Sequence, residues 1–182
     1  MREVYQKLYT ETDYGRAAAR SCPGLRYFTL YQRFLTAPVY DLGCGTGETV
    51  QHLRKEGFES LGCDWIDLNN GMDVADITKP LDLSRYKTAI CIDVLEHLQR
   101  EKMFGIFRNF AQVETVVASV HTGSSKWRPD NHELHINRRK LKEWENLFRD
   151  YFEISDAFCL ESKRRKLYIL RTTTESRRLL SE

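Results

Sequence analysis

The stretch VYDLGCGTGE, residues 39–48, decides the fold of this chain. Four strand-forming residues run directly into Gly43, Gly45 and Gly47, and a helical pattern follows at once over residues 48–56. Glycine adopts positive φ without steric cost and lets a ligand approach the main chain closely. A strand, a glycine loop and a helix in this order predict a ligand crevice at the carboxyl end of the first strand of an α/β sheet.

The residues around the glycines narrow the class of ligand. The dinucleotide fingerprint GxGxxG needs its third glycine where this chain has Glu48, and a carboxylate there would repel a pyrophosphate. NAD is therefore disfavoured. The GK[ST] sequence of a phosphate-binding P-loop is absent. Asp41, two residues before the first glycine, suits a ligand that carries a positive amino group and no phosphate.

Strand and helix patterns alternate along the rest of the chain. The expected strands cover residues 39–42, 59–64, 72–77, 88–93 and 113–120, and the expected helices cover residues 4–14, 27–35, 48–56, 97–110 and 137–151. Two further strands, 153–160 and 166–172, form a β-hairpin around a charged turn at 162–165, and residues 171–182 fray or form a short helix. We predict an α/β fold: a Rossmann-like, doubly wound, mostly parallel sheet that ends in an antiparallel β-hairpin.

Length and composition favour a single domain. The 182 residues suffice for one domain with a substantial core and are short for two. We assign residues 1–36 to a helical N-terminal lid and residues 37–172 to the α/β core, within one domain over residues 1–182. A hydrophobic content of 41% and a charged content of 30% are ordinary for a globular protein. The net charge of +2 neither demands nor excludes nucleic acid.

The sequence also bears on the cellular compartment. The longest apolar runs, residues 89–92 and 116–120, are far shorter than the roughly 18 residues of a membrane span, and no signal peptide is visible at the N-terminus. Five cysteines without a CxxC pair indicate buried free thiols in a reducing compartment rather than a zinc site. We expect a cytoplasmic protein that binds no membrane, and the sequence leaves its oligomeric state open.

Two segments of the chain resemble motifs of a known family. VYDLGCGTG, residues 39–47, is similar to the first motif of class I S-adenosylmethionine-dependent methyltransferases, and CIDVLEHL, residues 91–98, is similar to their fourth motif. The resemblance covers residues 41–110 and implies a methyltransferase with S-adenosyl-L-methionine as its cofactor. In one departure from the family, the helix usual between the second and third strands is cut to residues 68–71.

The resemblance also implies which residues hold the cofactor. Asp64 ends the second strand and accepts the ribose hydroxyls, as an acid does in dinucleotide folds. Asp76 accepts the adenine amino group and the Ile77 amide reaches a ring nitrogen, with Asp73 as the alternative acid. The predicted cofactor-binding residues are Tyr14, Asp41, Gly43, Cys44, Gly45, Gly47, Asp64, Trp65, Asp76, Ile77, Ile92 and Asp93. The alternative is that the strand-end acids merely cap helices or form turns.

The sequence narrows the class of methyl acceptor mainly through the motifs that it lacks. The (D/N)PP(Y/F) signature of amino-group methylation in bases is missing after Asp93, and so is a Cys-Pro nucleophile after the fourth strand. We predict O-methylation of a small polar acceptor. RNA or DNA methylation is the alternative, supported by basic residues at 163–166 and 138–140 together with Trp127-Arg128, which could follow a phosphate backbone. A non-catalytic cofactor-binding scaffold is the second alternative.

A histidine-bearing loop at residues 121–135 offers a general base. Histidine titrates near neutral pH, and in methyltransferases with a DVLEHL-type motif a histidine just before the next helix often faces the methyl donor. We predict that His135 removes the acceptor's proton, with His132 second and His97 as a rival; hydrogen bonding within the loop is the alternative role. HxxH beside Asp130 has too few ligands for a metal, so no metal site is predicted.

Overall fold

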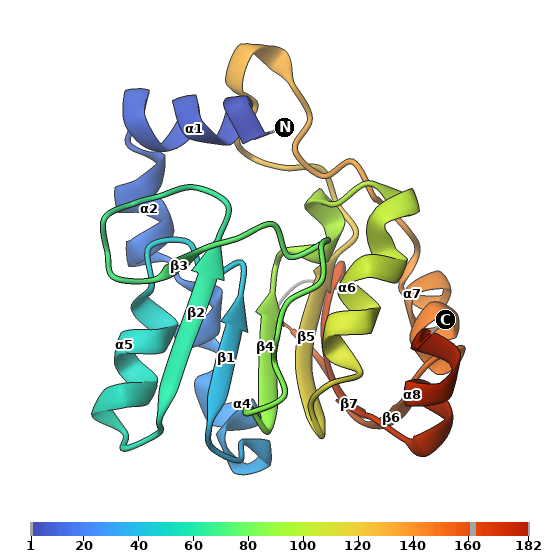
Figure 1. The fold of residues 1–182 in the computed structure, drawn as a ribbon. Coiled ribbons are helices and arrows are strands. Elements are labelled where there is room, and N and C mark those ends of the chain that lie inside the picture. The colour runs from blue at the N-terminus through green and yellow to red at the C-terminus, as the bar shows by residue number, and fades with distance from the viewer. Residues whose placement is uncertain (1, 161–162, 182) are drawn as a thin grey trace.

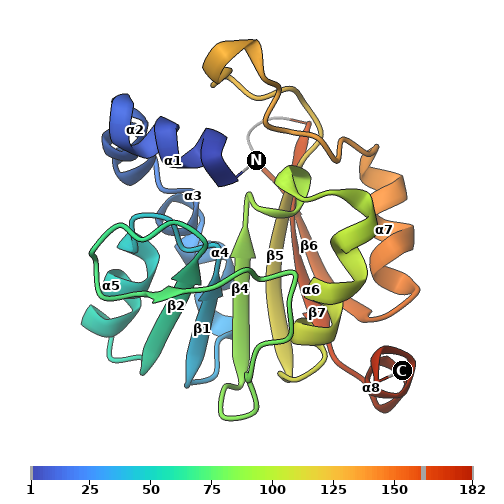
Figure 2. The same ribbon diagram turned by 45° about the horizontal axis from the view of Figure 1, so that its top comes forward.

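A computed structural model describes residues 2–160 and 163–181, which form a seven-stranded sheet flanked by helices (Figures 1 and 2). The strand order is β3-β2-β1-β4-β5-β7-β6. The strands are β1 (Val39–Leu42), β2 (Ser60–Asp64), β3 (Asp73–Val74), β4 (Thr88–Ile92), β5 (Thr115–His121), β6 (Glu153–Cys159) and β7 (Arg165–Arg171).

The direction of the strands fixes where the functional edge lies. β1 to β5 pair in parallel, and β7 then pairs antiparallel with both β5 and β6. The predicted fold class, a mostly parallel sheet ending in an antiparallel hairpin, is confirmed. The strand order reverses between β1 and β4, and ligands of such sheets bind at the carboxyl ends of the strands where the order reverses.

Helices lie on both faces of the sheet, and one of them lies across an edge of it (Figure 1). They are α1 (Arg2–Glu11), α2 (Tyr14–Arg20), α3 (Pro23–Arg26), α4 (Phe28–Tyr31), α5 (Glu48–Lys55), α6 (Met103–Phe110), α7 (Leu141–Arg149) and α8 (Thr174–Leu180). α1 lies across the carboxyl edge of the sheet rather than against a face (Figure 1). Within the described residues, no helix combines the length and the apolar character that crossing a bilayer requires.

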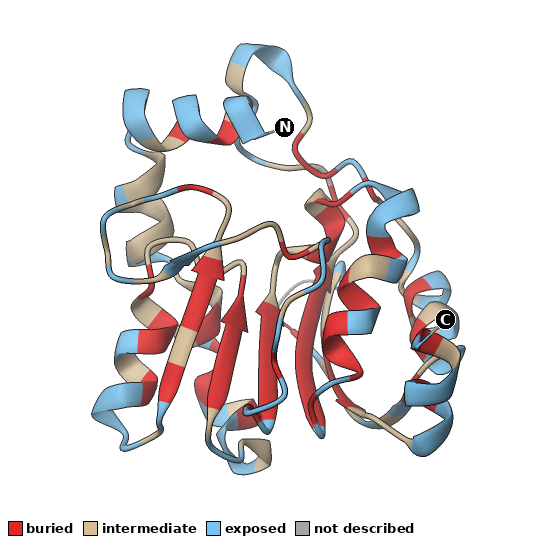
Figure 3. Cartoon of the chain, in the orientation of Figure 1, coloured by how far each residue is buried: buried red, intermediate tan, exposed pale blue. Residues whose placement is uncertain are grey.

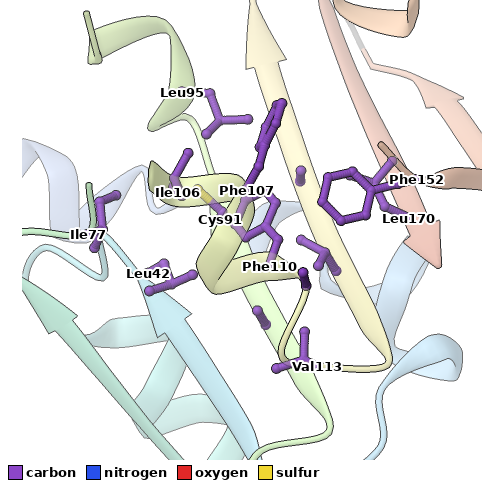
Figure 4. Close-up of a cluster of buried hydrophobic side chains, with 14 of the residues drawn as sticks. Leu42, Ile77, Cys91, Leu95, Ile106, Phe107, Phe110, Val113, Phe152 and Leu170 are labelled. Atoms are coloured by element: carbon purple, nitrogen blue, oxygen red, sulfur yellow. The ribbon is translucent and has the colours of Figure 1, made fainter. Parts of the chain in front are cut away.

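Apolar layers cover both faces of the sheet and bury its central strands β1, β4 and β5 (Figure 3). On one face, α6 contributes Phe107 and α7 contributes Trp144, both fully buried (Figure 4 shows part of this cluster). On the other face, Tyr31 of α4 and Leu53 of α5 belong to one buried apolar cluster with Val39 of β1. β1, β4 and β5 read as nearly continuous apolar runs because both of their faces are covered.

Several predicted element boundaries are wrong, each for a local reason. The helix expected over residues 97–110 starts only at Met103, because Leu98 and Gln99 are extended between two 3₁₀ turns. The helix expected over residues 137–151 starts at Leu141, where the side chain of Glu143 accepts the amide of Lys140 and fixes the first turn. The third strand shrinks to two exposed residues, one of them an aspartate.

The two ends of the chain also differ from expectation. The helix predicted over residues 4–14 is interrupted after Glu11, and residues 27–35 form one α-helical turn followed by a 3₁₀ turn. The C-terminal segment does form a short helix, α8, which begins on a Thr173 cap. Of the turn predicted at residues 162–165, Ser162 lies outside the described residues and Arg165 already belongs to β7.

The five cysteines are all free. Cys63 and Cys91 are buried in β2 and β4, Cys22 and Cys44 are half-buried, and Cys159 is exposed on the edge strand β6. The expectation of buried free thiols is therefore correct for two of them.

Phe107→Ala is expected to lower the free energy of unfolding by about 3–5 kcal/mol, because it removes a fully buried ring from the main core. Its ring centroid lies 5.3 to 6.1 Å from those of four other aromatic residues, so the cavity cannot collapse easily. Urea unfolding followed by circular dichroism measures the loss. Phe104→Ala on the same helix is the matched control: its side chain is 40% exposed, and we expect a loss of about 1 kcal/mol or less. Equal losses for the two variants would contradict this view of the core.

Candidate functional site

Three adjoining cavities open along the carboxyl edge of the sheet. We call them the flank pocket (about 330 Å³), the central pocket (about 100 Å³) and the wide pocket (about 570 Å³). The flank and central pockets share Trp65 and Asp76, and the central and wide pockets share Tyr14, Gly43 and Asp93. The three cavities therefore form one continuous crevice across the ends of β3, β2, β1 and β4.

The glycine loop forms part of the wall of this crevice. Gly43, Gly45 and Gly47 have φ of 81°, 52° and 85°, which other residues rarely adopt. A Cβ added at Gly43 would lie 2.7 Å from Val94, and one at Gly45 would lie 3.0 Å from the hydroxyl of Tyr9. The loop thus needs glycine both for its conformation and for the close approach of what lies over it.

Asp64 connects the glycine loop to the end of β2. Its Oδ2 accepts a hydrogen bond from the Gly45 amide at 3.0 Å, and its Oδ1 accepts one from the Ile66 amide at 3.2 Å. Burial raises the pKa of this carboxyl in spite of the two amides. Asp64 also lines the central pocket, so the carboxylate that holds the loop is presented to the crevice.

The structure separates the two acids that follow β2. Asp76 lines the flank and central pockets, and its Oδ1 accepts the Thr78 amide and hydroxyl at 2.9 and 2.7 Å. Partial burial opposes ionisation of Asp76, but the bonds from Thr78 outweigh it and lower the pKa. Asp73 instead accepts the Tyr40 hydroxyl at 2.8 Å and is exposed. Asp76 is therefore the acid that faces the crevice.

Asp41 is the most deeply buried of the predicted cofactor acids. It is 5% exposed in β1 and lines the wide pocket. Desolvation, and to a lesser extent the charge of Asp64, raise its pKa to about 7. A cation brought to this carboxylate would stabilise its charged form.

Asp93, at the end of β4, makes an ion pair that sequence reasoning missed. Its Oδ2 lies 2.8 Å from Nη2 of Arg165, and its Oδ1 accepts the Ser119 hydroxyl at 2.8 Å. The sequence placed Arg165 in an exposed turn. The antiparallel register of β5 and β7, which pairs His121 with Arg165, brings the guanidinium to the crevice instead. No local pattern signals this pairing, because it depends on hairpin register.

Aromatic side chains of the N-terminal helices cover the crevice. Tyr14 packs edge-to-face on Tyr9 and Trp127, with ring centroids 5.0 and 5.4 Å apart. The ring of Tyr5 lies 5.8 Å, centroid to centroid, from each of Trp65 and His97. Of these rings, Trp127 lines the wide pocket and the others line the central pocket. The sequence singled out Tyr14 alone, since Tyr5 and Tyr9 look like ordinary helix-packing residues.

The three histidines considered as bases occupy different places. His135 is 8% exposed, lines the wide pocket, and has Nδ1 2.6 Å from the carbonyl of Gly123. His97 lines all three pockets, and its ring centroid lies 4.6 Å from that of His135. Burial lowers the pKa of both, that of His97 to about 3. His132 is exposed and lines none of the three pockets.

The remaining predicted residues are distributed along the same edge. Trp65 and Ile77 line the central pocket, and Cys44 and Ile92 line the wide pocket. Gly47 is outside the pocket linings and acts as the N-cap of α5. Their contacts with a ligand remain predictions.

Most of the chain matches a known protein family. A family model described as a methyltransferase domain matches residues 14–152. No curated protein matches the chain. The expected family is thereby confirmed.

Three solved structures illustrate the similarity of fold. A 1,6-didemethyltoxoflavin-N1-methyltransferase from Burkholderia thailandensis, with bound 1,6-didemethyltoxoflavin and S-adenosylhomocysteine, matches with a TM-score of 0.72 and 15% identity over 94% of this chain and 88% of that one. Magnesium protoporphyrin IX methyltransferase from Synechocystis PCC 6803, with bound S-adenosylhomocysteine, matches with a TM-score of 0.62 and 15% identity over 87% of this chain and 84% of that one. The 16S rRNA methyltransferase RmtF, in complex with S-adenosyl-L-homocysteine, matches with a TM-score of 0.58 and 18% identity over 85% of this chain and 64% of that one.

Asp41 predicts a pH dependence of stability. Its folded pKa of about 7 exceeds its ordinary value of 3.8, so the native state binds more protons between these values and stability falls as pH rises from about 4 to about 7. Asp41→Asn removes this loss. As pH rises from 5 to 8, we expect the unfolding free energy of the unmodified protein to fall by about 2–3 kcal/mol relative to that of the variant, as measured by urea unfolding. Asp67→Asn, an exposed acid nearby, serves as control, and an unchanged pH slope in Asp41→Asn would contradict the assignment.

Proposed function

Because this chain belongs to the methyltransferase-domain family, we propose that it transfers a methyl group from S-adenosyl-L-methionine to a hydroxyl of a small polar acceptor. One observation carries the proposal: the glycine loop and the strand-end acids share a continuous crevice with the His135 pocket. The intact loop and all three acids, Asp41, Asp64 and Asp93, argue against a non-catalytic scaffold.

The residues of the crevice fit the cofactor. S-adenosylmethionine supplies a methyl group on a positively charged sulfonium, so transfer depends on alignment with the acceptor. The positive-φ glycines carry no Cβ, so a neighbouring group can approach the loop backbone closely, as the Tyr9 hydroxyl does: it would lie 3.0 Å from a Cβ added at Gly45. We assign the ribose hydroxyls to Asp64, the adenine amino group to Asp76 and the adjacent ring nitrogen to the Ile77 amide. Asp41 would hold the amino group of the methionine moiety.

The central pocket alone is too narrow for a nucleoside with a methionine tail. The ligand's ends would therefore extend into the flank pocket and the wide pocket, which share lining residues with it. Tyr14 and the rest of residues 1–36 would act as an aromatic lid over the bound cofactor. We retain residues 37–172 as the α/β core of the same domain.

The wide pocket is the proposed acceptor site. It has room for a small molecule, and its lining includes Ser125, His121 and His135, which offer hydrogen bonds to a polar acceptor. Burial lowers the pKa of His135, so its imidazole is neutral near pH 7. With Nδ1 against the Gly123 carbonyl, Nε2 is the atom available to take the acceptor's proton.

Nucleic acid is less well supported as the acceptor. In the basic segment, Arg165 pairs with Asp93, and Lys166 lies 2.5 Å from Glu145. Arg139 stacks on Trp144 at 5.6 Å. These three cations are engaged within the protein, which weakens the case for a track of phosphate contacts.

Asp64→Ala is expected to weaken binding of S-adenosylhomocysteine by about 1–3 kcal/mol, because it removes both the proposed hydrogen-bond partner of the ribose and the carboxylate that holds the Gly45 amide. Isothermal titration calorimetry measures the affinity, and circular dichroism checks that the fold survives. Asp67→Ala provides the matched control, since Asp67 is exposed and lines none of the three pockets. If Asp64→Ala binds as tightly as the unmodified protein while Asp67→Ala binds weakly, the ribose contact belongs to Asp67.

His135→Ala is expected to slow methyl transfer by about 10²–10⁴-fold, the usual range for loss of a general base, with cofactor affinity nearly unchanged. The defect should shrink at high pH, where the acceptor hydroxyl ionises unaided. Transfer of labelled methyl groups to an acceptor found by screening polar metabolites provides the assay. His132→Ala is the control, and a His135→Ala protein with full activity and an unaltered pH profile would remove His135 from the reaction.

A further inference from the structure

A buried carboxylate and two imidazoles gather at the inner wall of the wide pocket. One carboxylate oxygen of Glu96 and one ring nitrogen each of His97 and His135 lie within 4.8 Å of one another. A 3₁₀ turn after β4 supplies the first two residues, and the loop before α7 supplies the third. The Asn137 amide donates to the Glu96 carbonyl at 2.9 Å and keeps the two segments together.

Glu96 is the unusual member of this group. It is fully buried, and its Oε1 accepts the His121 amide at 3.0 Å. Its Oε2 is buried and has no hydrogen-bond partner among the described residues. A buried carboxylate oxygen without a partner is costly, and a cation at this position would supply the missing interaction.

Both histidines are held in a way that favours metal binding. Nδ1 of His97 lies 3.0 Å from the carbonyl of Leu134 and 2.7 Å from the hydroxyl of Tyr5, which can accept from the same Nδ1–H. Nδ1 of His135 lies 2.6 Å from the carbonyl of Gly123. An imidazole that donates its Nδ1–H to a carbonyl presents an unprotonated Nε2 on the opposite side of the ring. Proteins orient metal-binding histidines by this kind of second hydrogen bond.

From these contacts we propose that Glu96, His97 and His135 bind one divalent cation of the zinc, manganese, iron(II) or cobalt class. Two imidazoles and one carboxylate suit these ions, whereas calcium prefers a cage of oxygens. With metal–ligand bonds of about 2.0–2.2 Å, ligand atoms lie about 3–4 Å apart, so the side chains close by about 1 Å around the ion. His97 and His135 line the wide pocket, and the remaining coordination positions face that pocket.

A metal site here revises the expectation that the chain has none. That expectation counted only the HxxH histidines and Asp130 of the loop, of which His132 and Asp130 are exposed. The fold instead adds Glu96 and His97 from the DVLEHL segment to His135. This three-residue set cannot be recognised from spacing, because nearly 40 residues separate His135 from Glu96 and His97.

Metal binding does not depend on the proposed methyl transfer, but the two meet at His135. With a cation bound, His135 is a ligand and does not itself take the acceptor's proton. A cation held by these three residues would supply Lewis acidity, which would make an acceptor hydroxyl in the wide pocket easier to deprotonate, with the proton passing to solvent. The acceptor oxygen is then the nucleophile at the same place in the wide pocket.

Titration of the chelator-treated full chain with Zn²⁺, Mn²⁺ or Co²⁺ alone, followed by calorimetry, tests the site. We expect saturable binding of one ion per chain, a Co²⁺ absorption spectrum typical of nitrogen and oxygen ligands, and no comparable binding of Ca²⁺. Glu96→Gln and His135→Ala should each weaken binding at least about 100-fold, since even the loss of an outer hydrogen-bond partner costs 10- to 100-fold. His132→Ala, an exposed histidine of the same loop, should bind like the unmodified protein.

Absence of stoichiometric binding by the unmodified protein would overturn the proposal, as would unchanged binding in His135→Ala. Circular dichroism establishes whether Glu96→Gln folds; if it does not, His135→Ala and the Co²⁺ spectrum decide alone. These measurements use neither cofactor nor acceptor. Failure to bind metal therefore leaves the proposed methyl transfer standing, and failure to bind S-adenosylhomocysteine leaves the metal site standing.

Discussion

The attachment of the glycine loop to β2 is the constraint on which the rest of the site depends. The amides of Gly43 and Cys44 both donate to the Cys63 carbonyl, at 2.8 and 3.0 Å, and the Gly45 amide donates to the Asp64 carboxylate. These bonds turn the chain sharply at the end of β1, so that the start of α5 lies at the crevice. Because parallel strands share their carboxyl edge, the same turn places the loop beside the ends of β2 and β4.

The crevice formed in this way is rich in buried acids. Asp41 and Asp64 both have raised pKa values because burial disfavours their charged forms, and neither makes an ion pair within the described residues. Asp93 alone among the three is paired with an arginine there. A site that concentrates carboxylates without matching cations favours a positively charged ligand, which agrees with a sulfonium cofactor carrying an amino group and disagrees with a pyrophosphate.

The sequence was sufficient for those parts that follow from local pattern. The glycine spacing, the strand-end acids and the alternation of strands and helices predicted the fold class and the position of the crevice. Local pattern could not reveal the Asp93–Arg165 pair, which depends on the register of β5 against β7. It also missed the approach of Tyr9 to Gly45, because only the folded chain carries α1 across the edge of the sheet.

Titration of the purified chain with S-adenosylhomocysteine and, separately, with NAD⁺ tests the central claim most directly. The glycine loop ending in Glu48, with Asp64 at the end of β2, predicts saturable one-to-one binding of S-adenosylhomocysteine and no detectable heat with NAD⁺. Binding of NAD⁺ in the absence of any binding of S-adenosylhomocysteine would contradict the account of this crevice.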